Sequence, residues 1–170
     1  EVKFIAGDGE HTAIIKKDEV SLKMIQPEYE KESIWVEGMY GYLVDSGARH
    51  FLTEVNNFTS NQVKNIAPKI RYSEIFQPKG VNVNFFEYID EHTLNIWTYE
   101  KGIEKLVLSC GSGSTAVVFH AAKTCELTSP VKCIELGGNL TISFENNWKN
   151  VWLTGKAVLL FESEIDINNL

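Results

Sequence analysis

The sequence lacks the features that mark membrane-bound or nucleic-acid-binding proteins. No window approaches 18 consecutive apolar residues, the length at which a segment is interpreted as a membrane-spanning helix. Residues 1–5 have no charged stretch followed by an apolar stretch, so they do not resemble a signal peptide. A formal charge of −7, from 16 basic and 23 acidic residues, argues against a nucleic-acid or anionic-membrane partner. We therefore predict no membrane partner, no nucleic-acid partner and a cytoplasmic location.

Cysteine is scarce as well. Cys110, Cys125 and Cys133 are odd in number and show no Cys-x-x-Cys spacing, which argues against a disulfide scaffold and against a zinc site. We predict reduced thiols and no bound metal. The chain has 170 residues, of which 44% are hydrophobic, enough to bury a real core in one ordinary domain or two small ones.

Most of the chain has the pattern of short strands separated by turns. Residues 34–44 are long enough for two strands, or for one strand bent at Gly38. Residues 82–89 and 94–99 are predicted to pair as a hairpin. The other runs that favour strand are residues 2–6, 12–15, 20–24, 50–55, 131–136, 140–144, 151–153 and 158–161.

Two segments favour helix. Ser60 is predicted to cap a short helix over residues 60–64, which stops before Pro68. Residues 111–125 form the strongest helical pattern, and this helix is apolar on nearly every side, so we expect it to be buried all round. The predicted fold class is therefore α+β, with a curved, mostly antiparallel, barrel-like sheet wrapped around one central hydrophobic helix.

The most informative stretch surrounds Cys110. This cysteine is expected where a strand or loop meets the N-terminus of the buried helix, and glycines flank it. Free N–H groups and the helix dipole favour an anion there, so they would lower the thiol pKa from about 8.5 toward neutrality. They could also hold a substrate carboxylate. A buried structural cysteine beside a glycine-rich turn is the alternative.

This stretch resembles the diaminopimelate epimerase family. Members typically have Tyr-Glu-Arg-Gly, a short spacer and then Ala/Ser-Cys-Gly-Thr/Ser-Gly, which residues 99–102 and 109–113 approach closely. The resemblance extends from about Phe4 to the end of the chain, with the motifs in family order and spacing. The other matching segments are residues 46–50, 80–85, 136–142 and 153–157.

The resemblance implies two similar domains, each with strands around a central helix, and an active site between them. Each domain supplies one cysteine: one thiolate removes the α-proton of an amino acid, and the other thiol protonates the opposite face. Neither pyridoxal phosphate nor any other cofactor takes part. Residues 1–170 would be the C-terminal domain, with Cys110 as its cysteine and with Cys125 and Cys133 in the core. The N-terminal cysteine domain would lie upstream or on a partner chain, and the final strand could belong to it.

The same resemblance assigns roles to further residues. His50 and Glu100 match the polar pair near the cysteines, so with Cys110 they form the predicted catalytic set. Asn82, Lys101 and residues Gly111, Ser112 and Gly113 are predicted to bind the substrate. Taken alone, His50 could be a hydrogen-bonded core or surface histidine, Glu100 a surface charge at a strand end, and Asn82 a turn cap.

Two positions depart from the family pattern where it contacts the distal end of diaminopimelate. Ala48 replaces an asparagine, and Lys101 replaces an arginine, which loses the bidentate fork. Three hypotheses stay open: a diaminopimelate epimerase with unusual distal contacts, a racemase of another amino acid, and a non-catalytic binding or assembly domain. The first two need a small-molecule amino-acid substrate and a second cysteine domain. A homodimer is also left open.

Overall fold

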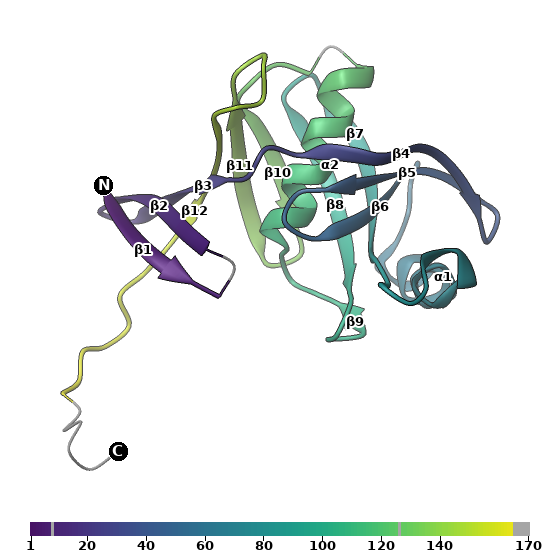
Figure 1. Ribbon diagram of the computed structural model, residues 1–170, viewed down its shortest axis with the longest axis horizontal. Helices are drawn as coiled ribbons and strands as arrows, with labels where there is room; N and C mark the ends of the chain where they lie inside the picture. The colour runs from purple at the N-terminus through teal and green to yellow at the C-terminus, as the bar shows by residue number, and fades with distance from the viewer. Residues whose placement is uncertain (8, 126, 165–170) are drawn as a thin grey trace.

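The strands form one open sheet. The computed structural model describes residues 1–7, 9–125 and 127–164. Within them the strand order is β1-β2-β3-β12-β11-β10-β8-β7-β6-β5-β4, and the short β9 pairs with β8 (Figure 1). The strands are Val2–Ala6 (β1), Gly9–Lys16 (β2), Glu19–Met24 (β3), Glu28–Val36 (β4), Met39–Asp45 (β5), Arg49–Glu54 (β6), Asn82–Asp90 (β7), Thr93–Glu100 (β8), Lys105–Leu106 (β9), Val131–Glu135 (β10), Gly138–Phe144 (β11) and Val151–Lys156 (β12).

Most neighbouring strands are antiparallel, as predicted, but two pairs are parallel. These are β6 with β7 and β8 with β10. The connection from β6 to β7 contains helix α1, Ser60–Tyr72, and the short 3₁₀ helix η1, Glu74–Phe76. The connection from β8 to β10 contains helix α2, Gly111–Thr124. Each parallel pair is therefore a strand–helix–strand unit, which antiparallel hairpins alone could not produce.

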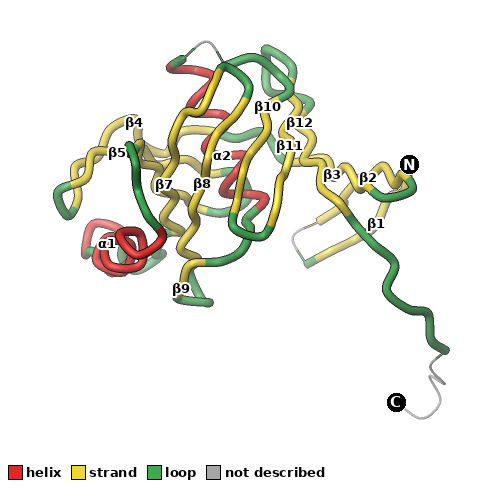
Figure 2. Tube along the Cα trace, turned by 180° about the vertical axis from the view of Figure 1, so that it is seen from behind, coloured by secondary structure: helices red, strands yellow, loops and turns green. Residues whose placement is uncertain are grey.

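The two helices lie on opposite faces of the sheet. Both connections move the chain in the same direction across the sheet, but β6 and β8 run in opposite directions. Because such crossovers are nearly always right-handed, the two helices are expected on opposite faces. The packing agrees: α1 buries Val63 and Ala67 in one core cluster, whereas α2 buries Val117 and Val118 in another. Both helices contact β7 and β8 (Figure 2).

The period of two along the strands separates these clusters. Phe51 and Phe85 point to the α1 side, and the next residue of each strand, Leu52 and Phe86, points to the α2 side. All four side chains are fully buried. The central strands therefore bury apolar side chains on both faces, because each face is covered by a helix.

Helix α2 is buried as predicted. Residues 113–121 are all buried, and both Val117 and Val118 have 0% exposure. The helix contacts β5, β6, β7, β8 and β11. The predicted barrel-like wrap is not confirmed: in the described residues the sheet is open, with β1 and β4 as the two ends of the strand order. The part of the chain that the structure describes is an open sheet with two α-helices.

Helix α1 is longer than predicted. It begins after Thr59, whose side chain accepts a hydrogen bond from the Gln62 N–H and completes a capping box, and it runs through Pro68 to Tyr72. A proline inside a helix removes a backbone hydrogen bond and usually ends it. Here the burial of Val63, Ala67 and Ile70 against the sheet maintains the helix on both sides of the proline. No helix in the described residues is long and apolar enough to cross a membrane.

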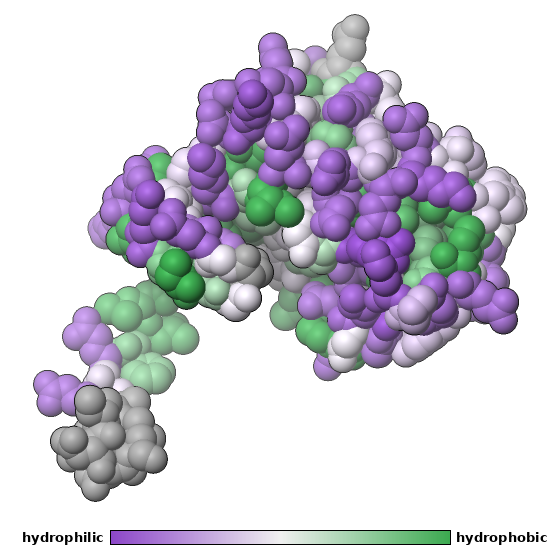
Figure 3. All heavy atoms as spheres, in the orientation of Figure 1, coloured by the Kyte–Doolittle hydropathy of each residue, from purple (hydrophilic) through white to green (hydrophobic). Residues whose placement is uncertain are grey.

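The predicted strand at residues 158–161 is wrong. Strand β12 continues to Lys156, and the Ala157 N–H still donates to the Asp18 carbonyl oxygen. Beyond it, residues 157–164 have no regular structure and leave the body of the molecule (Figure 1). Four apolar side chains there are exposed, and they appear as the hydrophobic stretch near the end of the chain in Figure 3: Val158, Leu159, Leu160 and Phe161. An apolar run becomes a strand only when a neighbouring strand satisfies its backbone groups.

Candidate active site

Cys110 lies at the N-terminus of α2. It is the N-cap residue, its backbone is extended (φ −145°), and it is half-buried. Its Sγ lies 3.6 Å from Ser112 Oγ. The N–H groups of a first helical turn have no partner within the helix, so this position favours negative charge. The thiol therefore occupies the place that the sequence predicted for it.

Glu135 already occupies part of this helix N-terminus. It is the last residue of β10 and is only 8% exposed. Its Oε2 accepts a hydrogen bond of 2.7 Å from the Cys110 N–H, and its Oε1 accepts one of 2.5 Å from Ser114 Oγ. Burial raises the pKa of the Glu135 carboxyl, while the hydrogen bonds from Ser114 and Cys110 oppose that shift. The Glu135 side chain thus takes up the N–H group of the N-cap residue, which was predicted to be free for a substrate.

The predicted lowering of the Cys110 pKa is wrong in this structure. Burial is the largest effect, and it raises the pKa of the thiol above its ordinary value. The Ser112 hydroxyl and the Gly113 N–H act in the opposite direction, whereas the negative charges of Glu100 and Glu135 add to the rise. The helix N-terminus does favour the thiolate, but burial and two carboxylates outweigh it.

His50 belongs to a buried chain of hydrogen bonds that reaches Cys110. Thr98 Oγ1 donates to Asn84 Oδ1 over 2.9 Å, and Asn84 Nδ2 lies 2.9 Å from His50 Nδ1. His50 Nε2 lies 3.1 Å from Ser112 Oγ, which in turn neighbours the Cys110 thiol. His50, Asn84 and Thr98 are almost fully buried. Four elements, β6, β7, β8 and α2, therefore meet at one polar network.

The hydrogen bonds fix the tautomer of His50. Asn84 uses Oδ1 as the acceptor for Thr98, so its Nδ2 is the donor to His50 Nδ1. His50 Nδ1 must then carry no hydrogen, and Nε2 carries it and donates to Ser112 Oγ. Burial lowers the pKa of His50 to about 3, so the ring is neutral at pH 7. The Ser112 hydroxyl therefore keeps its own hydrogen for another acceptor, and Cys110 Sγ is within its reach.

Both glycines of the Cys-Gly-x-Gly segment lie where an added side chain would meet its neighbours. A Cβ on Gly113 would lie 2.5 Å from Asn84 Oδ1 and 3.3 Å from Cys110 Sγ. A Cβ on Gly111 would collide with a methyl group of Leu153. These glycines allow the first turn of α2 to approach the buried network and β12. Their predicted role in substrate binding stays a prediction.

The remaining predicted residues lie where the end of β8 meets the start of β7. Glu100 is half-buried, and its charge acts on the Cys110 thiol. Asn82 is buried, and its Oδ1 accepts a 2.8 Å hydrogen bond from the Lys101 N–H. Lys101 Nζ donates to the Lys79 carbonyl oxygen over 3.2 Å. Asn82 and Lys101 thus form a pair of their own, whereas His50, Ser112 and Gly113 cluster around Cys110.

Sequence reasoning missed several members of the network. Asn84 lies two residues after Asn82 on the same strand, so the strand period places both on one face, and this signal was available. Glu135 and Thr98 come from other strands, and nothing in their local sequence links them to Cys110. Cys133 is buried as predicted, but the placement of Cys125 in the core is wrong: it is exposed just after the last residue of α2.

A small pocket opens beside the network. It has a volume of about 270 Å³ and lies next to Ser112 and the β5–β6 turn, where Ser46 Oγ donates to the Ser112 carbonyl oxygen over 2.8 Å. Residues of β2 and β3, among them His11 and Leu22, form its other wall. The first turn of α2 is therefore reachable from one side.

Comparison with known proteins identifies the family. The diaminopimelate epimerase family model matches residues 42–160, a stretch that contains Cys110 and its whole hydrogen-bond network. The chain belongs to the diaminopimelate epimerase family. The diaminopimelate epimerase of Aquifex aeolicus is 35% identical over 140 residues, which cover 80% of this chain and 50% of that protein. That of Flavobacterium psychrophilum is 35% identical over 167 residues, covering 95% of this chain and 63% of that protein.

Solved structures show the same fold at low sequence identity. A hydroxyproline epimerase from Agrobacterium vitis has a TM-score of 0.68 at 18% identity, covering 91% of this chain and 56% of that one. A phenazine biosynthesis protein of the PhzF family from Enterococcus faecalis has a TM-score of 0.63 at 16% identity, covering 94% of this chain and 62% of that one. Like these matches, the curated relatives are longer: this member of the family spans between half and two thirds of their length.

Proposed function

We propose that this chain carries one half of the active site of a cofactor-independent epimerase that interconverts LL- and meso-diaminopimelate in the cytoplasm. The observation that carries the proposal is the position of Cys110. It is the N-cap of the buried helix α2, within the segment that matches the family, and a buried polar network ends on its thiol. In the whole protein we place α2 at the centre of a barrel-like domain, with the remaining part of the protein facing Cys110.

The reaction needs an acid and a base on opposite faces of the α-carbon. A second cysteine, outside this chain, would take the α-proton as a thiolate while the Cys110 thiol gives its proton to the other face. The α-carbon is inverted, the second cysteine ends as a thiol, and Cys110 ends as a thiolate. Because burial raises the pKa of Cys110, this thiol is suited to start as the acid. In the reverse direction its thiolate is a correspondingly strong base.

The buried network would assist Cys110 when it carries the negative charge. Hydrogen bonds run in one direction from Thr98 through Asn84 and His50 to Ser112, so the Ser112 hydroxyl is the donor left for the sulfur. A hydroxyl hydrogen bond stabilises a thiolate, which agrees with its lowering effect on the pKa of Cys110. Glu135 opposes this effect from the other side of the N-cap.

The substrate assignment rests on the family and on the reacting end of the site. Two positions predicted to read the distal end depart from the family pattern: Ala48 offers no polar side-chain atom, and Lys101 Nζ is engaged with the Lys79 carbonyl oxygen. These positions favour a racemase of another amino acid as the second candidate. A panel of amino acids in the same assay separates the two candidates.

The proposal also requires a second half. Exposed apolar side chains on the first strands and along residues 158–161 offer surface for it, including Phe4, Ile5 and Ile15 (Figure 3). We therefore expect the 170-residue chain alone to show no epimerisation of LL-diaminopimelate by chiral chromatography, whereas the protein that also contains the second cysteine domain does. Rapid epimerisation by the isolated chain would contradict the two-cysteine mechanism.

A further inference from the structure

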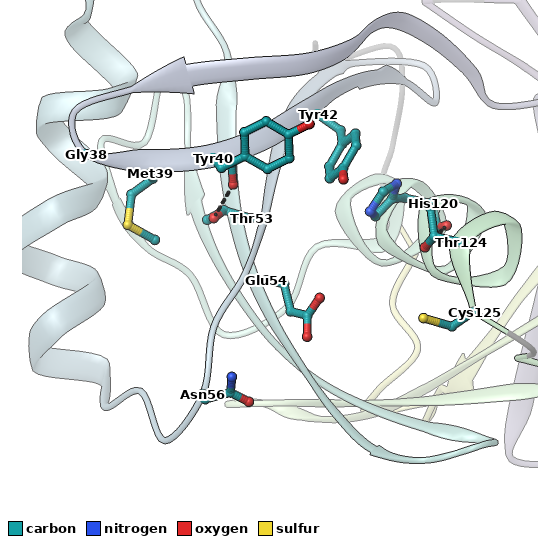
Figure 4. A pocket seen from close by; sticks show the side chains of 10 residues that line it. All are labelled: Gly38, Met39, Tyr40, Tyr42, Thr53, Glu54, Asn56, His120, Thr124 and Cys125. Atoms are coloured by element: carbon teal, nitrogen blue, oxygen red, sulfur yellow. Dashed lines mark hydrogen bonds between the residues drawn. The ribbon is translucent and has the colours of Figure 1, made fainter.

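A second, larger pocket lies at the other end of α2 from Cys110. It has a volume of about 390 Å³, and its walls come from β5, β6 and the last turn of α2 (Figure 4). A helix rises about 1.5 Å per residue, so the length of α2 puts this pocket about 20 Å from the N-cap. It shares no lining residue with the network around Cys110, and neither the family resemblance nor the proposed epimerase reaction uses it.

Aromatic rings form one side of this pocket. Tyr40 and Tyr42 project from β5, and their ring centroids lie 5.6 Å apart in an edge-to-face arrangement. The ring of Tyr42 packs against the ring of His120 with centroids 3.8 Å apart. Tyr40 is 50% exposed, although it is a large aromatic residue. Tyr40 therefore has exposed ring surface that a ligand can cover, and Tyr42 is only half-buried.

The electrostatic character of the pocket is negative. Glu54 on β6 extends its carboxylate into the same space as Tyr42 and His120 (Figure 4). The lining contains no lysine or arginine, and among the described residues Glu54 makes no ion pair. Burial raises the pKa of Tyr42, and Tyr40 and the charge of Glu54 add to that rise.

The end of α2 and the side chain of His120 also bear on the negative character of this pocket. The last carbonyl groups of α2 point toward this end, where the helix dipole is negative. His120 does not compensate with positive charge, because burial lowers its pKa to about 4 and leaves the ring neutral at pH 7. Its Nδ1 is 2.8 Å from the Tyr29 hydroxyl. An anionic ligand would therefore meet repulsion from Glu54 and from the helix end.

We propose that this pocket binds a small organic cation, an alkylammonium or methylated ammonium group, with the charge between the rings of Tyr40 and Tyr42 and the Glu54 carboxylate. Aromatic faces attract such cations, and an unpaired carboxylate beside them supplies the opposite charge. A metal ion is not the occupant, since the described residues contain no cluster of three or more His, Cys, Asp or Glu side chains suited to one. The site stands independently of the proposed epimerase activity.

The test compares a cation with its neutral isostere. Choline and 3,3-dimethylbutan-1-ol have the same shape and differ in charge, so each is titrated into the ¹⁵N-labelled protein, followed by amide chemical shifts. We expect choline to shift amides around residues 38–42, 53–56 and 120–124 and to bind at least about fivefold more tightly than the alcohol. Equal affinities would overturn the cation proposal in favour of a merely apolar pocket, and the absence of shifts in these segments would overturn the site.

Substitutions in the pocket test which side chains contribute to the binding of choline. Glu54→Gln should weaken choline binding at least about threefold and leave binding of the alcohol unchanged, because only the charge is removed. Glu19→Gln, at an exposed carboxylate on β3, is the matched control and should change neither. Tyr40→Leu, at a half-exposed ring whose loss leaves the core intact, should also weaken choline binding. Undiminished choline binding in both Glu54→Gln and Tyr40→Leu would contradict the proposal.

Discussion

At the residue scale, Cys110 lies between groups that act on its acidity in opposite directions. Burial and the carboxylates of Glu100 and Glu135 favour the neutral thiol, whereas the Ser112 hydroxyl and the Gly113 N–H favour the thiolate. Of the two carboxylates, Glu135 holds the Cys110 backbone directly. A single substitution at Glu135 can therefore remove the negative charge and keep an oxygen that accepts the hydrogen bond from the Cys110 N–H.

Glu135→Gln tests that balance. The amide keeps the size of the side chain and one accepting oxygen but loses the charge, so the pKa of Cys110 should fall. We expect alkylation of Cys110 by iodoacetamide at pH 7 to accelerate about threefold to tenfold, since one pKa unit changes the thiolate fraction about tenfold. Peptide mapping by mass spectrometry gives the rate, with Glu91→Gln in the exposed β7–β8 turn as the control. An unchanged or slower rate would show that the charge of Glu135 does not raise the pKa of the Cys110 thiol.

The buried, neutral His50 makes a prediction about acid stability. Its pKa is lowered to about 3 in the folded protein, against about 6.5 when unfolded. Between these values the unfolded state binds a proton that the folded state does not, so stability falls as the pH falls below about 6.5. The contribution of this one histidine is at most about 1.4 kcal/mol per pH unit.

The measurement is urea unfolding at pH 7, 6 and 5. His50→Gln should flatten the fall in the free energy of unfolding, even though it lowers stability at pH 7 by disturbing the contacts with Asn84 and Ser112. His92→Gln, at an exposed histidine, should leave the slope as it is. Parallel slopes for the wild type and His50→Gln would show that His50 is not held neutral.

At the scale of elements, α2 joins the core to the candidate active site. Its middle is fully buried, and its first turn packs so closely on β7 and β8 that Gly113 has no room for a side chain. Gly113→Ala should destabilise the protein by about 1–3 kcal/mol, because the added Cβ would lie 2.5 Å from Asn84 Oδ1. Alanine is otherwise the better helix former, so helix propensity alone predicts the opposite sign.

Thermal unfolding separates these outcomes. Gly7→Ala provides the control, because a Cβ there meets nothing within 4 Å. Equal or higher stability of Gly113→Ala, with an unchanged alkylation rate of Cys110, would show that the first turn of α2 can move away from Asn84.

The helices and strands also show which parts of the fold the sequence patterns could predict. The strand pattern predicted β1 and the hairpin of β7 and β8 well, and the all-round apolar character of residues 113–121 predicted the burial of α2, because these signals are local. Helix α1 passes Pro68 because tertiary packing outweighs the local cost. Residues 158–161 have the composition of a strand but no partner strand among the described residues.

For the candidate site, only the residues close to Cys110 in sequence or in a family motif could be predicted. Cys110, Ser112 and Gly113 are contiguous, and His50 and Glu100 came from motifs. Glu135 approaches Cys110 through the pairing of β10 with β8, a parallel contact between strands that the α2 crossover connects. The predicted low thiol pKa failed for the same reason, since burial and Glu135 are properties of the assembled fold.

At the scale of the whole molecule, the sheet is open and the candidate site is exposed on one side. The pocket beside Ser112 and the apolar side chains of the first strands and of residues 158–161 lie where a further domain can pack. A reaction that inverts a carbon atom needs groups on both of its faces, and we propose that this chain supplies one of them. In the proposed mechanism, Cys110 therefore acts together with a thiol from the rest of the protein.

The most direct test is solvent exchange at the α-carbon by the complete protein. In D₂O, the wild type should convert LL- to meso-diaminopimelate with deuterium at the inverted carbon. Cys110→Ala should reduce this conversion at least about a hundredfold, the scale of a lost general acid or base. Cys125→Ser, at an exposed cysteine, should retain it. Conversion by a folded Cys110→Ala protein at the wild-type rate would contradict the assignment of Cys110 as a proton-transfer group.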